Sequence, residues 1–183
     1  MSVSYDFSGK VALITGSSSG IGAATAILFA KSGEKVVVTG RNEEGIKSVA
    51  KQCSDVSPNK SKALEVVADV TQEEDLNRLV KTTIDTFGRL DILVNNVGAA
   101  IKGVNINDKD FYEIYKQILD VDLNSVIQLT HKCVEYLSKT KGNIINISSI
   151  RSTQAVNIII KLYNPGVAKG CDVKLNHLCY YEH

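Results

Sequence analysis

The sequence predicts an α/β protein of the Rossmann type, with a doubly wound parallel sheet that carries helices on both faces. Short, continuous apolar runs alternate with longer segments whose apolar residues recur at helical spacing. Continuous apolar runs are typical of strands buried on both faces of a parallel sheet. Parallel strands need crossover connections, and a helix after each strand supplies them. A glycine-rich segment directly after the first run also favours this fold.

Two strand–helix units are expected at the start of the chain. The run at residues 10–15, KVALIT, predicts a strand, and residues 21–31 predict a helix that ends before Gly33. Residues 35–39, KVVVT, are the second expected strand, and residues 42–53 form a polar helix.

Three further strands are expected at residues 64–68, 90–94 and 142–147. Thr71 is predicted to cap a helix that reaches Phe87, because Glu74 follows at capping-box spacing. Residues 108–136 predict one or two helices. The apolar residues available for burial in that segment and just after it are Leu119, Ile127, Leu129, Val134 and Leu137.

The regular pattern extends to about Ser149 and then changes. Residues 158–160 suit another strand, but Asn164, Pro165 and Gly166 end any continuation. The rest of the chain has neither helical nor strand periodicity. We therefore expect a single dinucleotide-binding domain over residues 1–183, with an atypical tail at 150–183 and a C-terminal part of the sheet that is missing or irregular.

Composition excludes several classes of function. The 183 residues are 44% hydrophobic and 22% charged, which is typical of a globular protein. With 21 basic against 20 acidic residues, the net charge of +1 predicts neither a nucleic-acid nor a membrane-surface partner. The chain has no apolar run of about 18 residues and no secretory signal, which predicts a cytoplasmic protein.

The four cysteines fit a reducing compartment. Cys53 and Cys133 are expected to be buried or half-buried thiols. Two further cysteines and two histidines cluster near the end of the chain, but their spacing matches no zinc pattern, so no metal site is predicted. These four residues are Cys171, His177, Cys179 and His183.

The segment from Thr15 to Gly22, TGSSSGIG, lies between the first strand and the first helix. Gly16 permits a tight turn, Gly20 lets a pyrophosphate approach the backbone, and Gly22 allows close helix packing. Amides at the start of the helix would then face the phosphates. The alternative is a glycine-rich turn that only joins strand to helix.

This TGxxxGxG segment resembles the fingerprint of the classical short-chain dehydrogenase/reductase family. Similar matches, in the family's order, are the segments 95–98 (NNVG), 69–70 (DV) and 146–149 (NISS). The resemblance implies a dinucleotide-binding site and covers about the first 150 residues. The residues it assigns to the cofactor loop, the adenine and the ribose are Gly16, Gly20, Ile21, Gly22, Asp69, Val70, Asn96 and Gly98.

Arg41 decides the expected cofactor. Enzymes that use NAD usually place a carboxylate after the second strand, where it binds the adenosine ribose. Here Thr39 and Gly40 are followed by Arg41, and the first acid is Glu43. A planar cation suits a 2′-phosphate, so NADP is expected and NAD is disfavoured. The alternative is that Arg41 is a solvated surface charge.

The catalytic residues that the resemblance implies are incomplete. Ser149 fits the family's serine, and Tyr163 is the tyrosine nearest the expected position. The family pairs its tyrosine with a lysine four residues later, but Val167 stands there. Asp122 occupies the place of the family's asparagine, and Asn124 is expected to be an exposed helix residue.

The gap in the catalytic motif has two explanations. In the first, residues 166–172 are a degraded version of the family's catalytic helix. In the second, residues 164–167 match a turn that comes later in the family, and the catalytic helix has been skipped. By resemblance, the function is NAD(P)-dependent oxidoreduction of a carbonyl or secondary alcohol by hydride transfer. The alternatives are an inactive NADP-binding or regulatory protein, and a truncated or splice-variant product. A small-molecule substrate is expected, with homo-oligomerisation weakened by the missing C-terminal helix.

Overall fold

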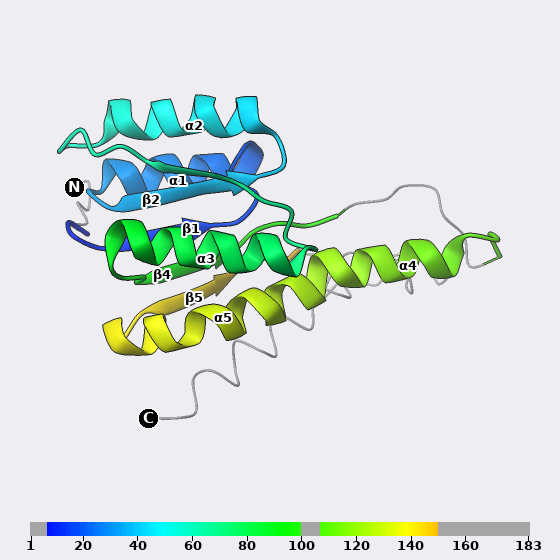
Figure 1. Cartoon of the computed structure of the whole chain (residues 1–183). Coiled ribbons are helices and arrows are strands. Elements are labelled where there is room, and N and C mark those ends of the chain that lie inside the picture. Colours follow the sequence, from blue (N-terminus) through cyan, green and yellow to red (C-terminus); the bar gives the residue numbers. More distant parts are fainter. Residues whose placement is uncertain (1–6, 100–106, 150–183) are drawn as a thin grey trace.

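A computed structural model describes residues 7–99 and 107–149 and shows one parallel five-stranded sheet (Figure 1). The strand order is β3-β2-β1-β4-β5, which confirms the predicted Rossmann-type fold. The strands are β1 (Val11–Ile14), β2 (Lys35–Gly40), β3 (Leu64–Val67), β4 (Ile92–Asn95) and β5 (Asn143–Asn146). The helices are α1 (Gly20–Lys31), α2 (Glu43–Val56), α3 (Glu73–Phe87), α4 (Phe111–Leu119) and α5 (Ser125–Thr140), with the π-helix η1 (Asp120–Asn124) between the last two.

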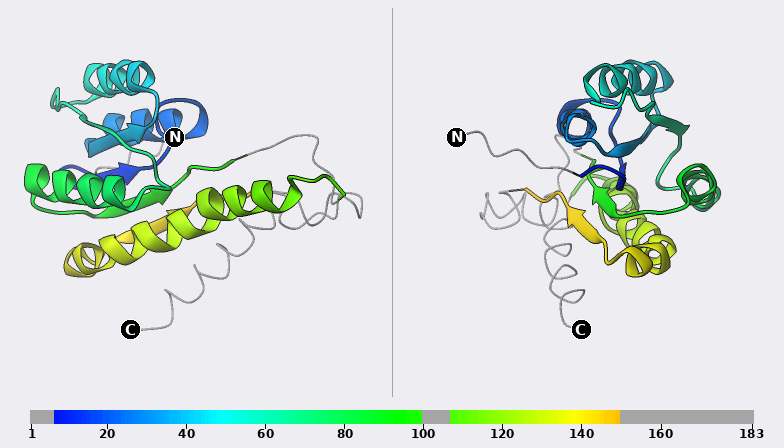
Figure 2. Two further views of the ribbon diagram at one scale, coloured as in Figure 1. Left: turned by 45° about the vertical axis from the view of Figure 1, so that its right-hand side comes forward. Right: turned by 90° about the vertical axis from the view of Figure 1, so that its left-hand side faces the viewer.

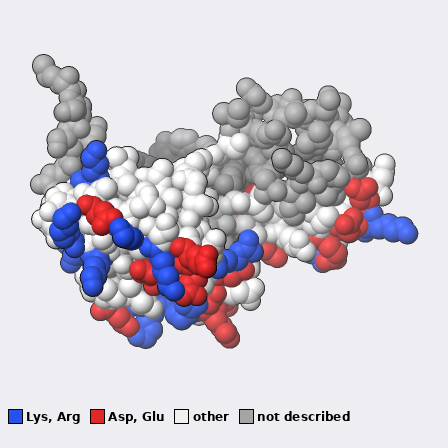
Figure 3. All heavy atoms as spheres, turned by 90° about the horizontal axis from the view of Figure 1, so that it is seen from above, with Lys and Arg blue, Asp and Glu red and all other residues white. Residues whose placement is uncertain are grey.

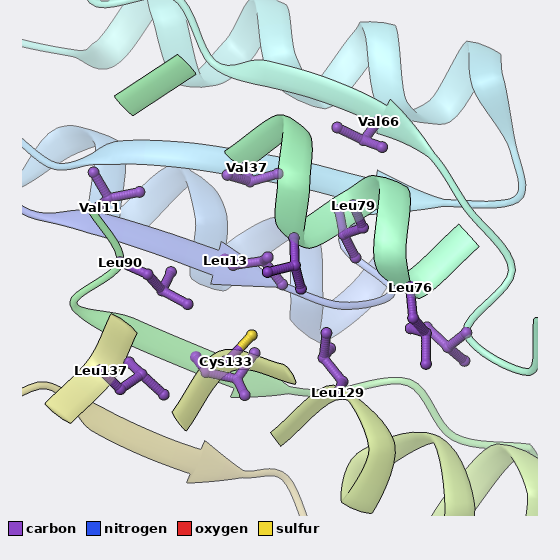
Figure 4. Close-up of a cluster of buried hydrophobic side chains, with 13 residues drawn as sticks. Val11, Leu13, Val37, Val66, Leu76, Leu79, Leu90, Leu129, Cys133 and Leu137 are labelled. Carbon is purple, nitrogen blue, oxygen red and sulfur yellow. The ribbon is translucent and has the colours of Figure 1, made fainter. Parts of the chain in front are cut away.

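Helices cover both faces of the sheet, as a doubly wound topology requires (Figure 2). Strand β1 is at most 1% exposed at every residue. Ala12 and Ile14 join the apolar cluster under α1 and α2, whereas Val11 and Leu13 join the cluster under α3 and α5. Figure 4 shows this second cluster, in which Leu13 lies among side chains from α3 and α5. The continuous apolar run that predicted this strand is thus explained by burial on two faces.

The helix after β3 begins differently from the prediction. Helix α3 has Gln72 as its N-cap, and the Thr71 hydroxyl donates instead to Asp69 Oδ1 at 2.8 Å. The predicted capping box of Thr71 and Glu74 is therefore wrong, because the aspartate in the loop before the helix binds the threonine first.

Residues 108–136 were expected to form one or two helices. They contain α4 and most of α5, joined without a loop through the five-residue π-helix η1. Leu129 and Leu137 are buried as predicted. Ile127 and Val134 are 45% and 46% exposed, so the prediction that they are available for burial is wrong. They lie off the face of α5 that packs on the sheet.

Charges of both signs are interspersed on the face that carries α2 (Figure 3). Several are paired along that helix, with Lys47 Nζ 2.6 Å from Glu43 and Lys51 Nζ 2.7 Å from Asp55. Cys53 and Cys133 are buried free thiols, as expected.

Within the described part of the chain, no helix is long and apolar enough to span a membrane, and no metal-binding cluster of His, Cys, Asp or Glu occurs. Several predictions fall on residues outside that part. They concern the strand at 158–160, the catalytic residue Tyr163, and the cluster of Cys171, His177, Cys179 and His183.

Candidate functional site

A cleft of about 530 Å³ opens at the carboxyl ends of the parallel strands. The strand order reverses between β1 and β4, and ligands of open α/β sheets bind at such a switch point. The volume is in the range of small-molecule sites. The cleft is lined by Gly16, Ser18, Ser19, Ile21, Gly40, Arg41, Ala68, Asp69, Val70, Asn96, Val97, Gly98, Ala99, Gln117 and Val121. All the residues predicted for the cofactor except Gly20 and Gly22 are among them.

The glycine loop has the backbone that its sequence predicts. Gly16 and Gly20 have φ angles of +62° and +57°, a region that side-chain-bearing residues rarely adopt. A Cβ on Gly20 would meet no atom of the protein within 4 Å, so this side of the loop is open. Helix α1 begins there. Its N-cap, Ser19, makes no side-chain capping bond within the described structure, and its first turn has no acidic residue. The amides at this helix start are therefore available to an anion.

Ser17 ties the glycine loop to β2. This serine is fully buried, and its hydroxyl donates to the carbonyl of Ile14 at 2.7 Å and accepts from the amide of Thr39 at 2.9 Å. The Ser17 amide donates to the carbonyl of Thr39 at 2.9 Å. The loop is thus held where the first two strands end. Sequence reasoning missed Ser17, because the motif treats the residues between its glycines as variable.

Asn96 ties the same loop to β4. Its side-chain Nδ2 donates to the carbonyls of Thr15 at 2.9 Å and Gly16 at 3.2 Å. In return, the Thr15 hydroxyl accepts from the amides of Asn96 at 2.9 Å and Val97 at 3.2 Å. Asn96, whose backbone was predicted to line the ribose, therefore supports the loop with its side chain. Thr15 was missed as a supporting residue.

The need for glycine at position 22 follows from this arrangement. A Cβ on Gly22 would lie 2.4 Å from the carbonyl oxygen of Gly16 and 2.5 Å from Asn96 Nδ2. Gly22 therefore lets α1 lie directly against the Gly16 carbonyl and the Asn96 side chain. These two groups are the neighbours behind the close helix packing predicted for this glycine.

The far end of the cleft holds Arg41 and Asp69. The Arg41 side chain is 81% exposed, and its guanidinium lies 3.9 Å from Asp69 Oδ2. Asp69 is fixed by its neighbours, since Oδ1 accepts from the Thr71 amide at 3.0 Å and the Asp69 amide donates to Asp75 Oδ2 at 2.8 Å. That amide and then the Arg78 guanidinium lower the pKa of Asp75. A largely exposed cation thus lies beside an anchored carboxylate.

Asp122 lies at the bend between α4 and α5. It is fully buried within η1, and its Oδ1 accepts from the amide of Ala99 at 2.7 Å. π-Helices often mark functional sites, and this one ties the bend to the cleft wall. Asn124 is exposed as predicted, and its Nδ2 donates to Asp120 Oδ1 at 2.7 Å.

Ser149 is half-buried just beyond the carboxyl end of β5. At this end of the sheet, the side chains of β4 and β5 are joined, because Asn95 Nδ2 donates to Asn146 Oδ1 at 2.8 Å. The structure thus places Ser149 at the cleft end of the sheet. Its predicted partner, Tyr163, lies outside the described residues.

Comparison with known proteins decides the family. A profile described as short chain dehydrogenase matches residues 10–163, most of the chain. The chain belongs to the short-chain dehydrogenase family.

Among curated family members, this chain is similar to the L-fucose dehydrogenase of Mus musculus. It is 37% identical over 144 residues, which cover 79% of this chain and 50% of that protein. The chain spans about half the length of the curated relatives it matches.

Two solved structures share the short-chain dehydrogenase fold. A Caenorhabditis elegans member of unknown function, solved with cofactor, is 37% identical with a TM-score of 0.83, covering 94% of this chain and 64% of that chain. A 7α-hydroxysteroid dehydrogenase, solved with NADH and 7-oxo glycochenodeoxycholic acid, is 28% identical with a TM-score of 0.81. That match covers 93% of this chain and 64% of the other.

Proposed function

We propose that this chain binds NADP(H) in the cleft at the carboxyl ends of β1 to β4. The observation that carries the proposal is the start of α1, where uncapped amides lie beside a cleft of about 530 Å³ that Ser19 and Ile21 line, and where a Cβ on Gly20 would meet no protein atom within 4 Å. A pyrophosphate fits this position, because it needs backbone donors and close approach to the chain. In the proposal, Gly16, Ile21 and Gly22 form and support the phosphate loop.

The adenosine and ribose are assigned to the remaining cleft residues. Asp69 and Val70 would hold the adenine, and Asn96 and Gly98 would line the ribose. The bound nicotinamide would supply the hydride chemistry. Arg41 is the residue proposed to select NADP over NAD. It is a largely exposed cation that is free to turn towards a 2′-phosphate, and its contact with Asp69 is too long and too exposed to hold it.

A fluorescence titration with NADPH and NADH tests this assignment. A charge-assisted contact of about 1.5–3 kcal/mol predicts that NADPH binds roughly 10- to 150-fold more tightly than NADH. Arg41→Ala should remove most of that difference, whereas Lys62→Ala, an exposed cation away from the cleft, should leave it. Equal affinities in the unchanged protein, or an unaltered preference in Arg41→Ala, would contradict the proposal.

We further propose that the family's reaction, hydride transfer with a small carbonyl or secondary alcohol, is weak or lost in this chain. Ser149 is assigned to orient the carbonyl and Tyr163 to transfer the proton. The family's tyrosine is paired with a lysine four residues later, whose positive charge favours the phenolate, and Val167 stands at that position after Tyr163. Buried Asp122 replaces the amide of the family's asparagine.

The missing lysine and the buried Asp122 favour a second candidate function, an inactive NADP-binding or regulatory protein in the cytoplasm. An assay of NADPH oxidation with ketones, aldehydes and quinones distinguishes an active oxidoreductase from this inactive protein. Turnover that Ser149→Ala and Tyr163→Phe both abolish would establish the enzyme and refute the inactive assignment. Binding of NADPH with no turnover on any substrate class is the result we expect.

A further inference from the structure

A buried carboxyl lies at the opposite end of the sheet from the cleft. Glu34 precedes β2 and is 1% exposed. Both of its side-chain oxygens are buried and have no hydrogen-bond partner in the described structure. A buried carboxylate without a partner is costly, so such a group is held in its neutral form unless the surroundings supply donors.

Backbone hydrogen bonds hold the segment at residues 7–10 against the connection that contains Glu34. Residues 7–10 lie across the connection between α1 and β2, with the Phe7 amide donating to the Ser32 carbonyl at 3.0 Å. The Lys35 amide donates to the Lys10 carbonyl at 2.9 Å. The Glu34 amide donates to the Phe29 carbonyl at 3.2 Å, so the backbone of Glu34 is held while its carboxyl is not.

Two charged groups act on the carboxyl from neighbouring elements. Lys10, before β1, attracts its ionised form, and Asp91, before β4, repels it. Lys10 is exposed, and its ammonium lies 5.3 Å from the centre of the Phe7 ring. Asp91 is engaged by Arg89 in two hydrogen bonds of 2.8 and 2.6 Å, so that guanidinium is committed to another acid. The ammonium of Lys35, the residue after Glu34, lies over the Phe87 ring and not beside the Glu34 carboxyl.

We propose that Glu34 is a protonation switch at the amino end of the sheet: the turn at residues 7–10 is closed over the neutral acid and loosens when the acid ionises. This device is independent of the proposed cofactor site, which lies at the other end of the strands. The physical cause is the loss of solvation that an ionised Glu34 would suffer in the closed turn.

The direction of the pH dependence follows from burial. Burial raises the pKa of Glu34 from 4.5 to about 7, with Lys10 lowering it and Asp91 raising it. Between these two values the folded chain binds more protons than the unfolded chain, so stability falls as the pH rises through the window. From pH 5 to pH 8, the contribution of Glu34 changes the unfolding equilibrium constant on the order of 10²-fold.

Urea denaturation at pH 5 and pH 8 tests the switch. Glu34→Gln stays neutral, so its unfolding constant should be within about fivefold of that of the unchanged protein at pH 5 and on the order of 10²-fold smaller at pH 8. Glu34→Leu, of similar size and without polar atoms, should also lose the pH dependence, which keeps the test valid if the glutamine variant folds poorly. Glu65→Gln, at an exposed position on β3, should follow the unchanged protein. Parallel pH profiles for the unchanged protein and both Glu34 variants would overturn the proposal.

Hydrogen exchange locates the loosening. At pH 8, the amides of Phe7 and Lys35 should exchange faster in the unchanged protein than in Glu34→Gln, and at pH 5 the two proteins should exchange alike. Equal exchange of these amides at pH 8 would refute a switch in this turn.

Discussion

Substitution of Gly22 by alanine tests how the glycine loop is supported. The added Cβ would lie 2.4 Å from the Gly16 carbonyl oxygen and 2.5 Å from Asn96 Nδ2. Because the first of these atoms is backbone, α1 has to move away from the loop. The clash with Asn96 Nδ2 also displaces that side chain, so its two bonds to Thr15 and Gly16 are lost, at about 1 kcal/mol each. Overpacking adds about 1–3 kcal/mol. The expected loss of unfolding free energy is about 3–5 kcal/mol.

Gly20→Ala is the matched comparison on the same loop. Its φ of +57° strains an alanine by about 1–2 kcal/mol, but the Cβ meets no protein atom within 4 Å. Urea denaturation should therefore rank Gly22→Ala well below Gly20→Ala in stability. Equal stability of the two variants, or a Gly22→Ala protein as stable as the original, would refute the reasoning that the helix is pressed against Gly16 and Asn96.

Three other predictions concern the scaffold. Asn42→Ala removes the side-chain cap of α2, so the free energy of unfolding should fall by about 1 kcal/mol. Thermal denaturation should show this loss as a lower melting temperature, and an unchanged melting temperature would contradict a stabilising cap. Burial raises the pKa of Cys133 to about 12, so iodoacetamide at pH 8 should label this cysteine only after urea is added, as followed by peptide mass spectrometry; rapid native labelling would show an open core. Asp91→Ala removes the acceptor of both Arg89 bonds and of the buried Val11 amide bond of 2.9 Å, and it should cost about 2 kcal/mol in chemical denaturation. No loss would show that these bonds together contribute nothing.

The sheet and the backbone of the glycine loop were predictable because their signals are local. Strand β1 reads as a continuous apolar run since both its faces are covered, and the turn at Gly16 needs the positive φ that glycine supplies. The same holds for Asn124, whose polar side chain lies on an exposed helix surface. In each case, neighbouring residues decide the structure.

Some of the features that sequence reasoning missed depend on distant contacts, and others depend on local competition between side chains. Asn96 supports residues about 80 positions away, which no local pattern reveals. Thr71 was expected to cap α3, but Asp69 competes for its hydroxyl. The continuous bend through η1 gives no periodic signal of its own, and a glutamate such as Glu34 is normally expected at the surface.

The most direct test of the proposed function is the map of amide chemical shifts on titration with NADPH. We predict that the largest changes lie in residues 15–22, with further changes at 41, 68–70 and 96–99, because these segments surround the cleft. Amides at the amino end of the sheet, such as that of Lys35, should not move. The absence of any saturable shift, or changes centred away from the glycine loop, would contradict binding of the cofactor at this site.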